Sequence, residues 1–420
     1  MPRTLEQWLD YQLRTHPQQI AMGLERVAEV AKRLRLGRPA AQVVVVAGTN
    51  GKGSTVAFME SIARAAGLRV GAFTSPHLLR YNERIRVDGK DADDATLVAA
   101  FEAIEAARGE VPLTYFEFGT LAALHVVAAA GLDLALLEVG LGGRLDAVNI
   151  VDADVAVITT VDLDHQDYLG PDRESIGAEK AGILRAGRPC VLAERDPPSS
   201  VLREAYRIGA PAIRGHSDYL IERGDAGWSW REPGYQIELP LPALDAPAQL
   251  DNAAAAIAAL RALPLAIDDA AIRAGVAGAR VPGRLQRLQE VPELLVDVAH
   301  NPQAAAQLAA WLQSHPRPTR AVFSALADKD VAAIAALLDP LLLHWHVAGI
   351  GDAGARGLEG EALAARLPVD ADRITAHARV GQALAAALAQ SRPSDRVLVF
   401  GSFHTVADAM RAHAGEAGGV

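Results

Sequence analysis

The hydrophobic pattern of the chain alternates between short β-branched runs and longer stretches with helical spacing. Val43 to Val46 form a run of valines that predicts a buried parallel strand, and apolar residues between Val56 and Ala66 recur with the spacing of a helix. A glycine-rich segment, 48–54, lies between them. This order predicts a strand, a tight loop and a helix.

The same alternation continues through the first two thirds of the chain. It predicts strands at 69–74, 133–139, 155–160 and 189–193. It predicts helices at 94–107, 117–130, 174–184 and 249–263. Residues 5–36 are predicted to be one helical region with a buried side made of Leu13, Ile20, Leu24, Val27, Val30 and Leu34. Residues 213–240, with Tyr and Trp among Gly and Pro, predict a short β excursion.

A turn at Pro282-Gly283 is predicted to end the first domain. A second alternating unit follows, with strands at 294–298, 320–325, 343–348 and 396–400. Its predicted helices are 302–313, 330–338, 359–366 and 379–390. Strands that alternate with helices form mostly parallel sheets. We therefore expect an α/β protein with a larger domain at 1–284 and a smaller, Rossmann-like C-terminal α/β domain at 285–420.

The composition excludes several classes of partner. The 420 residues carry a formal net charge of −10, which leaves no basic surplus for a nucleic-acid backbone. The one cysteine, Cys190, excludes an internal disulfide and a cysteine-rich metal site. The start of the chain has no signal-peptide pattern, and no run of about 18 apolar residues occurs. We expect a cytoplasmic monomer that binds small molecules, with neither nucleic acid nor a membrane as a partner.

Segment 48–54, GTNGKGS, has the composition of a phosphate-binding loop. Its glycines let backbone N–H groups approach a phosphate at the start of the next helix. Lys52 would reach the outer phosphates, and the hydroxyl of Ser54 or Thr55 could bind Mg²⁺. The loop departs from the strict pattern at two positions, so the alternative is a glycine-rich turn without chemistry. The phosphate-binding interpretation makes the first domain a phosphate-loop ATPase domain.

Polar residues follow several of the predicted strands. A loop dense in His, Arg and hydroxyl groups, 75–87, follows the second strand, Glu138 ends a hydrophobic strand, and His165 follows another. The carboxyl ends of parallel strands meet at one sheet edge, where open α/β folds bind ligands. An acid at that edge, downstream of a phosphate loop, is typical of Mg²⁺ sites. The alternatives are a solvated surface loop for 75–87 and a structural role for His165.

Lysine is rare in this chain. Of the 41 basic residues, the lysines are Lys32, Lys52, Lys90, Lys180 and Lys329. A chain that uses arginine almost everywhere keeps lysine where a guanidinium is too wide or cannot lose its proton. This points to Lys52, Lys180 and Lys329, whereas the other two fit solvated faces. For Lys180, which follows Glu179, the alternative is a helix ion pair.

Together these residues resemble the Mur ligase superfamily of ATP-dependent amide ligases, and in particular its folate branch. The motifs that carry the resemblance are GTNGKGS at 48–54, SPHL at 75–78, YNERIRV at 81–87, TYFEF at 114–118, LEVGLGGRLDAVN at 137–149, LDHQDYLG at 163–170, RESIGAEKAGI at 173–183, PGRLQ at 282–286, DVAHNP at 297–302, LADKD at 326–330 and GSFH at 401–404. The resemblance implies addition of L-glutamate to dihydropteroate and to reduced folates through an acyl phosphate, with ATP and two Mg²⁺ ions.

The resemblance also implies which residues form the site. It assigns the ATP phosphates to Thr49, Asn50, Gly51, Lys52, Gly53 and Ser54, and further nucleotide contacts to Asn252, Arg284 and Asp297. It assigns one Mg²⁺ to Ser75 and Glu138, and the second to His165 and a carbamylated Lys180. The implied pterin contacts are Arg14, Thr15, His16, Pro17, Thr114, Tyr115, Phe116, Glu117, Leu145, Asp146 and Ala147. Glutamate recognition falls to His300 and Ser402. The implied catalytic residues are Lys52, Glu138, His165 and Lys180.

The sequence departs from the family pattern at two positions, and two other functions fit the same motifs. Val148 stands where the family usually has Thr, and Val298 where it usually has Gly, so each could change the substrate range. A cell-wall ligase that adds an amino acid to a nucleotide-linked sugar uses the same chemistry. A nucleotide-switched binding protein would use ATP only to change shape.

Overall fold

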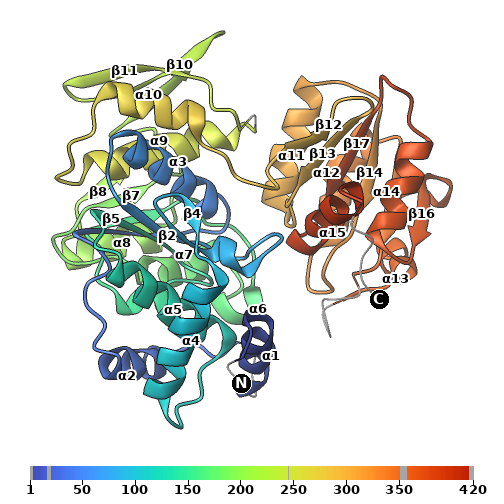
Figure 1. The fold of residues 1–420 in the computed structure, drawn as a ribbon. Helices are drawn as coiled ribbons and strands as arrows, with labels where there is room; N and C mark the ends of the chain where they lie inside the picture. The colour runs from blue at the N-terminus through green and yellow to red at the C-terminus, as the bar shows by residue number, and fades with distance from the viewer. Residues whose placement is uncertain (1–2, 17–19, 245, 351–356, 416–420) are drawn as a thin grey trace. The chain divides into compact units, whose positions relative to one another are not determined.

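The computed structural model describes residues 3–16, 20–244, 246–350 and 357–415. The chain forms two compact units. Unit 1 comprises Met1–Ala243 and Gln249–Arg280, and unit 2 comprises Leu244–Ala248 and Val281–Val420. Each unit has helices packed around a sheet, and the larger, mostly parallel sheet belongs to unit 1 (Figure 1). The predicted α/β fold class is confirmed.

The main sheet of unit 1 has the strand order β4-β3-β2-β5-β1-β6-β7-β8. The strands are β1 Gln42–Ala47, β2 Val70–Phe73, β3 Ile85–Val87, β4 Lys90–Asp91, β5 Leu134–Glu138, β6 Val155–Ile158, β7 Cys190–Leu192 and β8 Ala212–Arg214. In this order, β2, β5, β1, β6, β7 and β8 each run parallel to their neighbour. Strand β3 is antiparallel to β2, and β4 is antiparallel to β3. Valines 43–46 are buried in the central strand β1, as expected for a parallel strand covered on both faces.

The helix that follows β1 is α3, Lys52–Ala65. It begins after Gly51, whose φ of +88° is a left-handed conformation that glycine adopts without steric cost. The other helices of this part of the chain are α1 Leu5–Thr15, α2 Glu25–Arg33, α4 Asp94–Arg108, α5 Tyr115–Ala129, α6 Gln166–Leu169, α7 Arg173–Ala181, α8 Ser199–Ile208, α9 Ala248–Arg261 and α10 Asp269–Gly278. Helix α10 packs closely on α3, because a Cβ on Gly275 would collide with the backbone of Ile62.

The prediction of one helical region over residues 5–36 is wrong. The chain forms two helices there, α1 and α2, and the described residues 20–24 between them are not helical. On α1 the buried side chains are Trp8 and Gln12, whereas Leu13 is 59% exposed. Trp8 and Gln12 lie one helical turn apart on the same face, and Leu13 points about 100° away from Gln12. The two valines of α2 are buried, as predicted.

The predicted β excursion is confirmed as a small antiparallel sheet with the order β11-β10-β9. Its strands are β9 Leu220–Arg223, β10 Gly227–Glu232 and β11 Tyr235–Pro240. Trp228 and Trp230 alternate on β10 with exposed or half-buried residues and are themselves buried. The indole N–H of Trp230 donates to the carbonyl oxygen of Ala254 on α9, at 3.2 Å. The small sheet thereby contacts α9.

Unit 2 is built on a sheet with the order β12-β13-β17-β14-β15-β16. Its strands are β12 Gln286–Gln289, β13 Glu293–Asp297, β14 Thr319–Phe323, β15 His344–Ala348, β16 Ile374–His377 and β17 Arg396–Phe400. Only the β12–β13 pairing is antiparallel among the described strands of this sheet. Its helices are α11 Pro302–Ser314, α12 Val331–Leu338, α13 Gly360–Ala364, α14 Val380–Ala389 and α15 Phe403–His413. Phe323, Trp345 and Phe400 are fully buried in its core.

Candidate active site

The polar loops of unit 1 gather at one edge of its main sheet. Strands β2, β5, β1, β6 and β7 are consecutive neighbours and run parallel. Their carboxyl ends therefore meet at the same edge. The chemistry-bearing residues at or after these ends are Gly48 to Ser54, Ser75, Glu138, Asp162 to His165 and Glu194.

The phosphate loop is compact and closely packed. The ammonium nitrogen of Lys52 donates to the carbonyl oxygens of Gly48 and Thr49, at 2.9 and 3.3 Å. A Cβ on Gly51 would collide with Oδ1 of Asn252, a buried residue of α9. The structure therefore brings Asn252 against the loop, and glycine is required at position 51 by both its backbone conformation and its neighbour.

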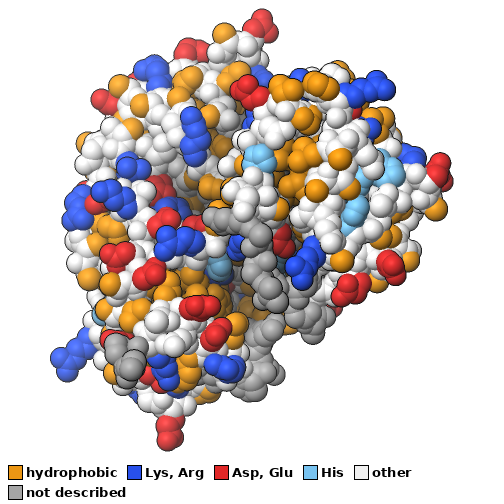
Figure 2. Space-filling view, turned by 45° about the vertical axis from the view of Figure 1, so that its right-hand side comes forward, with side chains coloured by type: hydrophobic (Ala, Val, Ile, Leu, Met, Phe, Trp, Pro, Cys, Tyr) orange, Lys and Arg blue, Asp and Glu red, His pale blue; other side chains and the backbone are white. Residues whose placement is uncertain are grey.

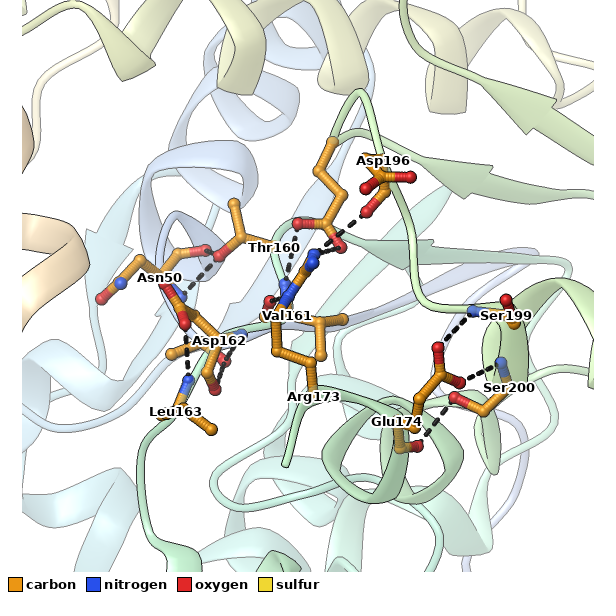
Figure 3. A network of polar contacts seen from close by, with 12 residues as sticks. Asn50, Thr160, Val161, Asp162, Leu163, Arg173, Glu174, Asp196, Ser199 and Ser200 are labelled. Carbon is orange, nitrogen blue, oxygen red and sulfur yellow. Dashed lines mark hydrogen bonds and ion pairs between the residues drawn. The ribbon is translucent and has the colours of Figure 1, made fainter. Parts of the chain in front are cut away.

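The loop after β6 forms hydrogen bonds with the phosphate loop. Oγ1 of Thr49 accepts the N–H of Asp162 at 3.0 Å and donates to the Asp162 carbonyl oxygen at 3.1 Å. The N–H of Asn50 donates to Oγ1 of Thr160 at 3.0 Å, and Oγ1 of Thr159 donates to the Asn50 carbonyl oxygen at 2.6 Å. Figure 3 shows Asn50, Thr160 and Asp162 in this network. These bonds fix the phosphate loop relative to the β6 loop.

Glu138 lies beside the first turn of α3. This last residue of β5 is 4% exposed. Its Oε2 accepts the N–H of Ser75 at 3.0 Å and is 3.6 Å from the place that a Cβ on Gly53 would occupy. Ser75 and Glu138 thus meet next to the phosphate loop, as their predicted roles require.

The donor set at Glu138 fits a hard divalent cation. Mg²⁺ is commonly bound by one or two carboxylates together with substrate phosphates and water. Among the described residues, no group of three or more His, Cys, Asp or Glu side chains is arranged to hold a metal ion. A cation at Glu138 would accordingly take its remaining ligands from phosphate oxygens and water.

Lys180, in the last turn of α7, is 3% exposed. Its pKa is lowered from 10.5 to about 7, chiefly by burial. The positive charge of Lys52 also lowers the pKa, while Asp164, Glu194 and Asp146 act in the opposite direction. A substantial fraction of the Lys180 side chain is therefore a neutral amine at neutral pH.

The sequence alternative for Lys180, an ion pair with Glu179, is not favoured. Glu179 pairs with Arg144 instead, with Nη2 and Oε1 2.8 Å apart. Its carboxylate is therefore directed to the loop after β5 rather than to Lys180.

Two carboxylates near Lys180, Asp164 and Glu194, were missed in the sequence. The N–H of His165 donates to Oδ1 of Asp164 at 2.9 Å, and Nε2 of His165 lies 3.9 Å from the same oxygen. Burial raises the pKa of Glu194 to about 7, although Nη2 of Arg173 lies 3.3 Å from its carboxylate and the N–H of Val161 donates to it. Figure 3 labels Arg173 and Val161. The signal that could have identified Glu194 is its position after strand β7.

The loop after β5 is organised around Asp146. Its Oδ2 accepts the N–H groups of Gly140 and Leu141 at 3.0 and 2.9 Å, and its Oδ1 accepts the N–H of Val148 at 3.0 Å. Burial raises the pKa of Asp146 to about 6 despite these three bonds. Asp146 therefore shapes the loop that also carries Leu145 and the buried Ala147.

The predicted pterin contacts of α5 divide into two kinds. Thr114 and Glu117 are buried and cap the helix: Oγ1 of Thr114 accepts the Glu117 N–H, and Oε2 of Glu117 accepts the Thr114 N–H. Glu117 also pairs with Arg26 at 2.8 Å. Tyr115 and Phe116 are half-buried at the same end of the helix. The aromatic pair is thus better placed than the capping pair to meet a ligand directly.

The first predicted pterin segment is only partly described. Arg14 is exposed near the end of α1 and His16 is half-buried after it. The side chain of Thr15 and the whole of Pro17 lie outside the described residues.

A neighbouring segment contacts the Asp146 loop. The N–H of Gly23 donates to the carbonyl oxygen of Leu145 at 3.4 Å. Cε of Met22 lies 3.8 Å from the place of a Cβ on Gly142. Nη2 of Arg26 donates to the carbonyl oxygen of Ala21 at 2.7 Å. Met22 and Gly23 therefore lie beside the Asp146 loop, a placement that sequence reasoning missed because neither residue has a charge or motif of its own.

In unit 2 the predicted residues lie at the carboxyl edge of the sheet. Asp297 ends β13 and accepts the N–H groups of Leu285 and Ala299, at 2.8 Å each. Burial raises the pKa of Asp297, and the nearby positive charge of Arg284 opposes this shift. Nδ1 of His300 lies 2.9 Å from the carbonyl oxygen of Val298.

The neighbouring strands of unit 2 contribute Ser402 and Lys329 to the same edge. Ser402 follows β17, and its Oγ accepts the N–H of Thr405 at 3.0 Å as the cap of α15. Lys329 follows β14 and is 7% exposed. A buried lysine in a chain rich in arginine agrees with the expectation that lysine is retained for a specific place.

Comparison with known families classifies this architecture. Residues 46–260 match the Mur ligase middle domain, and residues 283–403 match the Mur ligase glutamate ligase domain. The chain belongs to the Mur ligase family.

Its relatives within that family carry a more particular name. The chain is 46% identical over 409 residues to the dihydrofolate synthase/folylpolyglutamate synthase of Escherichia coli strain K12, which covers 97% of this chain and 94% of the relative. A structure of Escherichia coli FolC in complex with DHPP and ADP has a TM-score of 0.94 at 45% identity and covers 98% of each chain. A bifunctional folylpolyglutamate synthase/dihydrofolate synthase with Mn, AMPPNP and L-glutamate bound has a TM-score of 0.91 at 45% identity, again over 98% of each chain. The resemblance to the folate branch is confirmed.

On the face shown in Figure 2, acidic and basic side chains are interspersed. In the described part of the chain, no helix has the length and apolar character needed to cross a membrane. The monomeric state and the cytoplasmic location stay predictions.

Proposed function

We propose that this chain is an ATP-dependent ligase that joins L-glutamate to dihydropteroate, giving dihydrofolate, and to reduced folates, giving polyglutamates. In this proposal residues 1–284 bind ATP and the pterin substrate, and residues 285–420 bind glutamate. The family and the named relatives support the reaction class. The observation that carries the proposal is the convergence of the phosphate loop, Glu138 and the buried Lys180 at one sheet edge.

The chemistry requires activation of a carboxylate. At neutral pH a carboxylate does not react with an amine, because its carbonyl carbon is electron-rich and its oxygen is a poor leaving group. Transfer of the ATP γ-phosphoryl group to the acceptor carboxylate gives an acyl phosphate and ADP. The α-amino group of glutamate then attacks the carbonyl carbon, and phosphate leaves. The protein's contribution is positioning and charge stabilisation.

Several residues have defined tasks in this scheme. Lys52 balances the negative charge of the transferring phosphoryl group, and the backbone of residues 49–54 cradles the phosphates. Asn252, Arg284 and Asp297 contact the rest of the nucleotide. Asn252 has structural support for this role, because it lies against Gly51.

Two divalent cations complete the proposed site. Ser75 and Glu138 would hold one, and His165 with a carbamylated Lys180 would hold the other. The relative with bound Mn supports a divalent metal, and we assign Mg²⁺ to this chain. When bound, the cations supply positive charge at the phosphoryl group and at the acceptor carboxylate.

The carbamate follows from the chemistry of Lys180. The neutral amine attacks CO₂, an N–C bond forms, and one proton is released to solvent, which leaves an anionic carbamate. Its oxygens are ligands of the kind that hard cations prefer. An arginine could not replace this lysine, because its guanidinium stays protonated.

The pterin substrate is assigned to residues of α5 and of the loop after β5. Tyr115, Phe116 and residues 145–147 form the pterin site, with Thr114 and Glu117 supporting it through the start of α5. Met22 lies against Gly142, the next residue, Gly23, bonds to Leu145, and Met22 is added to the pterin site. Residues 14–17 keep their assignment from the family resemblance alone.

Glutamate recognition is assigned to His300 and Ser402. Both follow strands of the unit 2 sheet at its carboxyl edge, and Lys329 follows a third strand there. The buried ammonium of Lys329 offers a charge partner for a glutamate carboxylate.

The product of the reaction tests this function. The protein is incubated with ATP, Mg²⁺ and L-glutamate, and with dihydropteroate, tetrahydrofolate or a UDP-linked sugar acid as acceptor. We expect mass spectrometry to detect a glutamyl adduct of both pterin acceptors. An adduct of the UDP-linked acceptor alone would establish the cell-wall alternative. An adduct of only one pterin acceptor would contradict dual use, and Val148 would be the first position to exchange for Thr.

A further inference from the structure

A second polar site lies at the amino edge of the unit 2 sheet. This edge is at the opposite end of the strands from Asp297 and Ser402. Glu293 begins β13 and Arg396 begins β17, and the two residues are partners in the sheet register. Strands of five residues at about 3.3 Å per residue separate this edge from the carboxyl edge. A cavity of about 250 Å³ opens there, with Arg287, Glu293, Trp311, Arg317 and Arg396 in its lining.

Three guanidinium groups share the carboxylate of Glu293. Nε of Arg396 lies 2.6 Å from Oε2, and Nη1 of Arg317 lies 3.2 Å from the same oxygen. Nη2 of Arg287 lies 3.1 Å from Oε1. Three positive charges against one negative charge leave a formal excess of two positive charges at the cavity. Such an excess in a partly desolvated place attracts a further anion.

The deepest guanidinium is held in a fixed position. The Arg396 side chain is 4% exposed, and its Nη1 donates to the carbonyl oxygen of His315 at 3.0 Å. Its guanidinium carbon lies 4.7 Å from the centre of the Trp311 ring, which stacks on the His315 ring at 4.5 Å. The wall of the cavity is therefore formed before a ligand arrives.

The outer two guanidinium groups have the freedom to reach a ligand. The side chains of Arg287 and Arg317 are 57% and 39% exposed. A guanidinium has five N–H donors in a planar fork that matches phosphate oxygens. Arg287 and Arg317 each contact one oxygen of Glu293 through one nitrogen. Their other N–H donors can turn towards a bound anion.

We propose that this cavity binds the phosphate group of a small ligand. The positive excess supplies the charge, and the arginine forks supply the geometry. The source is either inorganic phosphate or a small phosphate monoester, which present the same group to the arginines. Binding stabilises unit 2, because a ligand held only by the folded state shifts the folding equilibrium towards it.

Calorimetric titration tests the proposal. Inorganic phosphate or glycerol 3-phosphate is titrated into the full chain saturated with AMPPNP and Mg²⁺, which occupy the phosphate loop, at ionic strength fixed with chloride. We expect saturable binding of at least one of the two. The double variant Arg287→Gln/Arg317→Gln should bind at least about tenfold more weakly, because it loses two charge-assisted donors. It retains Arg396 to balance Glu293, and circular dichroism checks its fold.

The control is Arg411→Gln, which removes an arginine on α15 that is 41% exposed and pairs with Asp408. It should bind as the wild type does. Three results would each overturn the proposal. The first is that neither phosphate binds saturably, and the second is that the wild type and the double variant bind with equal affinity. The third is that succinate binds more tightly than either phosphate. Glutamate ligation, measured with ATP on the same protein preparations without AMPPNP, is independent of this result.

Discussion

Lys180 is the residue whose proposed chemistry depends most on its surroundings. On a surface helix it would be an ordinary ammonium, but in the fold it is 3% exposed and its pKa falls to about 7. Conversion of its ammonium to a carbamate would place a negative charge beside Lys52. This change would remove the repulsion between the positive charges of Lys180 and Lys52. Burial and the neighbouring charge of Lys52 thus make a common side chain a candidate metal ligand.

Replacement of Lys180 by arginine should abolish most of the ligase activity. Lys180→Arg preserves the positive charge but cannot form a carbamate, and we expect turnover to fall at least about a hundredfold, the scale of losing a well-placed charge stabiliser. Lys32→Arg, at an exposed position, is the matched control and should retain full activity. Wild-type activity should also fall when CO₂ is removed from the buffer and return when bicarbonate is added. A fully active Lys180→Arg variant would refute the carbamate.

Single residues also show where sequence reasoning reached its limit. The phosphate-loop lysine and Glu138 were found because their type and position in a motif are distinctive. Asp164, Glu194 and Met22 were missed, because their environment depends on which loops the sheet order brings together. Periodicity likewise favoured Leu13 over Gln12 as buried, since hydrophobicity does not reveal which face of a short helix packs.

At the scale of elements, the β1–α3 loop is the most constrained part of the site. Gly51→Ala should weaken ATP binding at least about tenfold, because it adds a left-handed strain of roughly 1 kcal/mol and a collision with Asn252. Gly67→Ala provides the control: φ there is +79°, and nothing lies within 4 Å of the added Cβ. Calorimetric titration of ATP distinguishes the two variants. Equal loss of affinity in both would mean that the loop has no special role.

Strands β15 and β16 carry a histidine cluster that should make unit 2 sensitive to acid. His346 is fully buried, and its Nδ1 lies 3.2 Å from Nε2 of His377. Burial, together with the nearby positive charges of His344, His377 and Arg320, lowers the pKa of His346 to about 4. Above pH 6.5 neither the folded nor the unfolded state protonates this residue. Between pH 6.5 and 4 only the unfolded state does, so the free energy of unfolding should fall with pH by up to about 3 kcal/mol.

Hydrogen exchange of the β13, β14 and β17 amides at pH 7 and pH 4.5 measures this effect within unit 2. His346→Gln retains a polar side chain that does not titrate in this range, so its stability should decline less between the two pH values. An identical decline in the wild type and the variant would show that other groups cause the acid sensitivity.

The strong strands and long helices could be predicted, whereas several elements at the margins could not. Four valines in succession identify β1, and the alanine-rich α9 is equally plain. β12 and β16 were not predicted, because both are short edge strands with few buried side chains. Such strands form through pairing with a neighbour, which a local pattern does not encode.

At the scale of the whole molecule, the alternation of strands and helices was sufficient to predict two α/β units. It was not sufficient to predict the strand orders, in which β5 lies between β2 and β1, and β17 between β13 and β14. These insertions place Glu138 beside the phosphate loop, and Ser402 beside Asp297. The order of strands in the sheet, rather than the order of motifs in the chain, assembles the site.

The central claim is that ATP is consumed only to join glutamate to a pterin carboxylate, and phosphate release measures this most directly. Release is followed in the complete mixture and with ATP, dihydropteroate, glutamate or Mg²⁺ omitted in turn. The account predicts steady release only in the complete mixture, with one phosphate formed for each glutamyl bond. Undiminished phosphate release in the absence of both glutamate and the pterin acceptor would contradict it and would favour a nucleotide-driven switch.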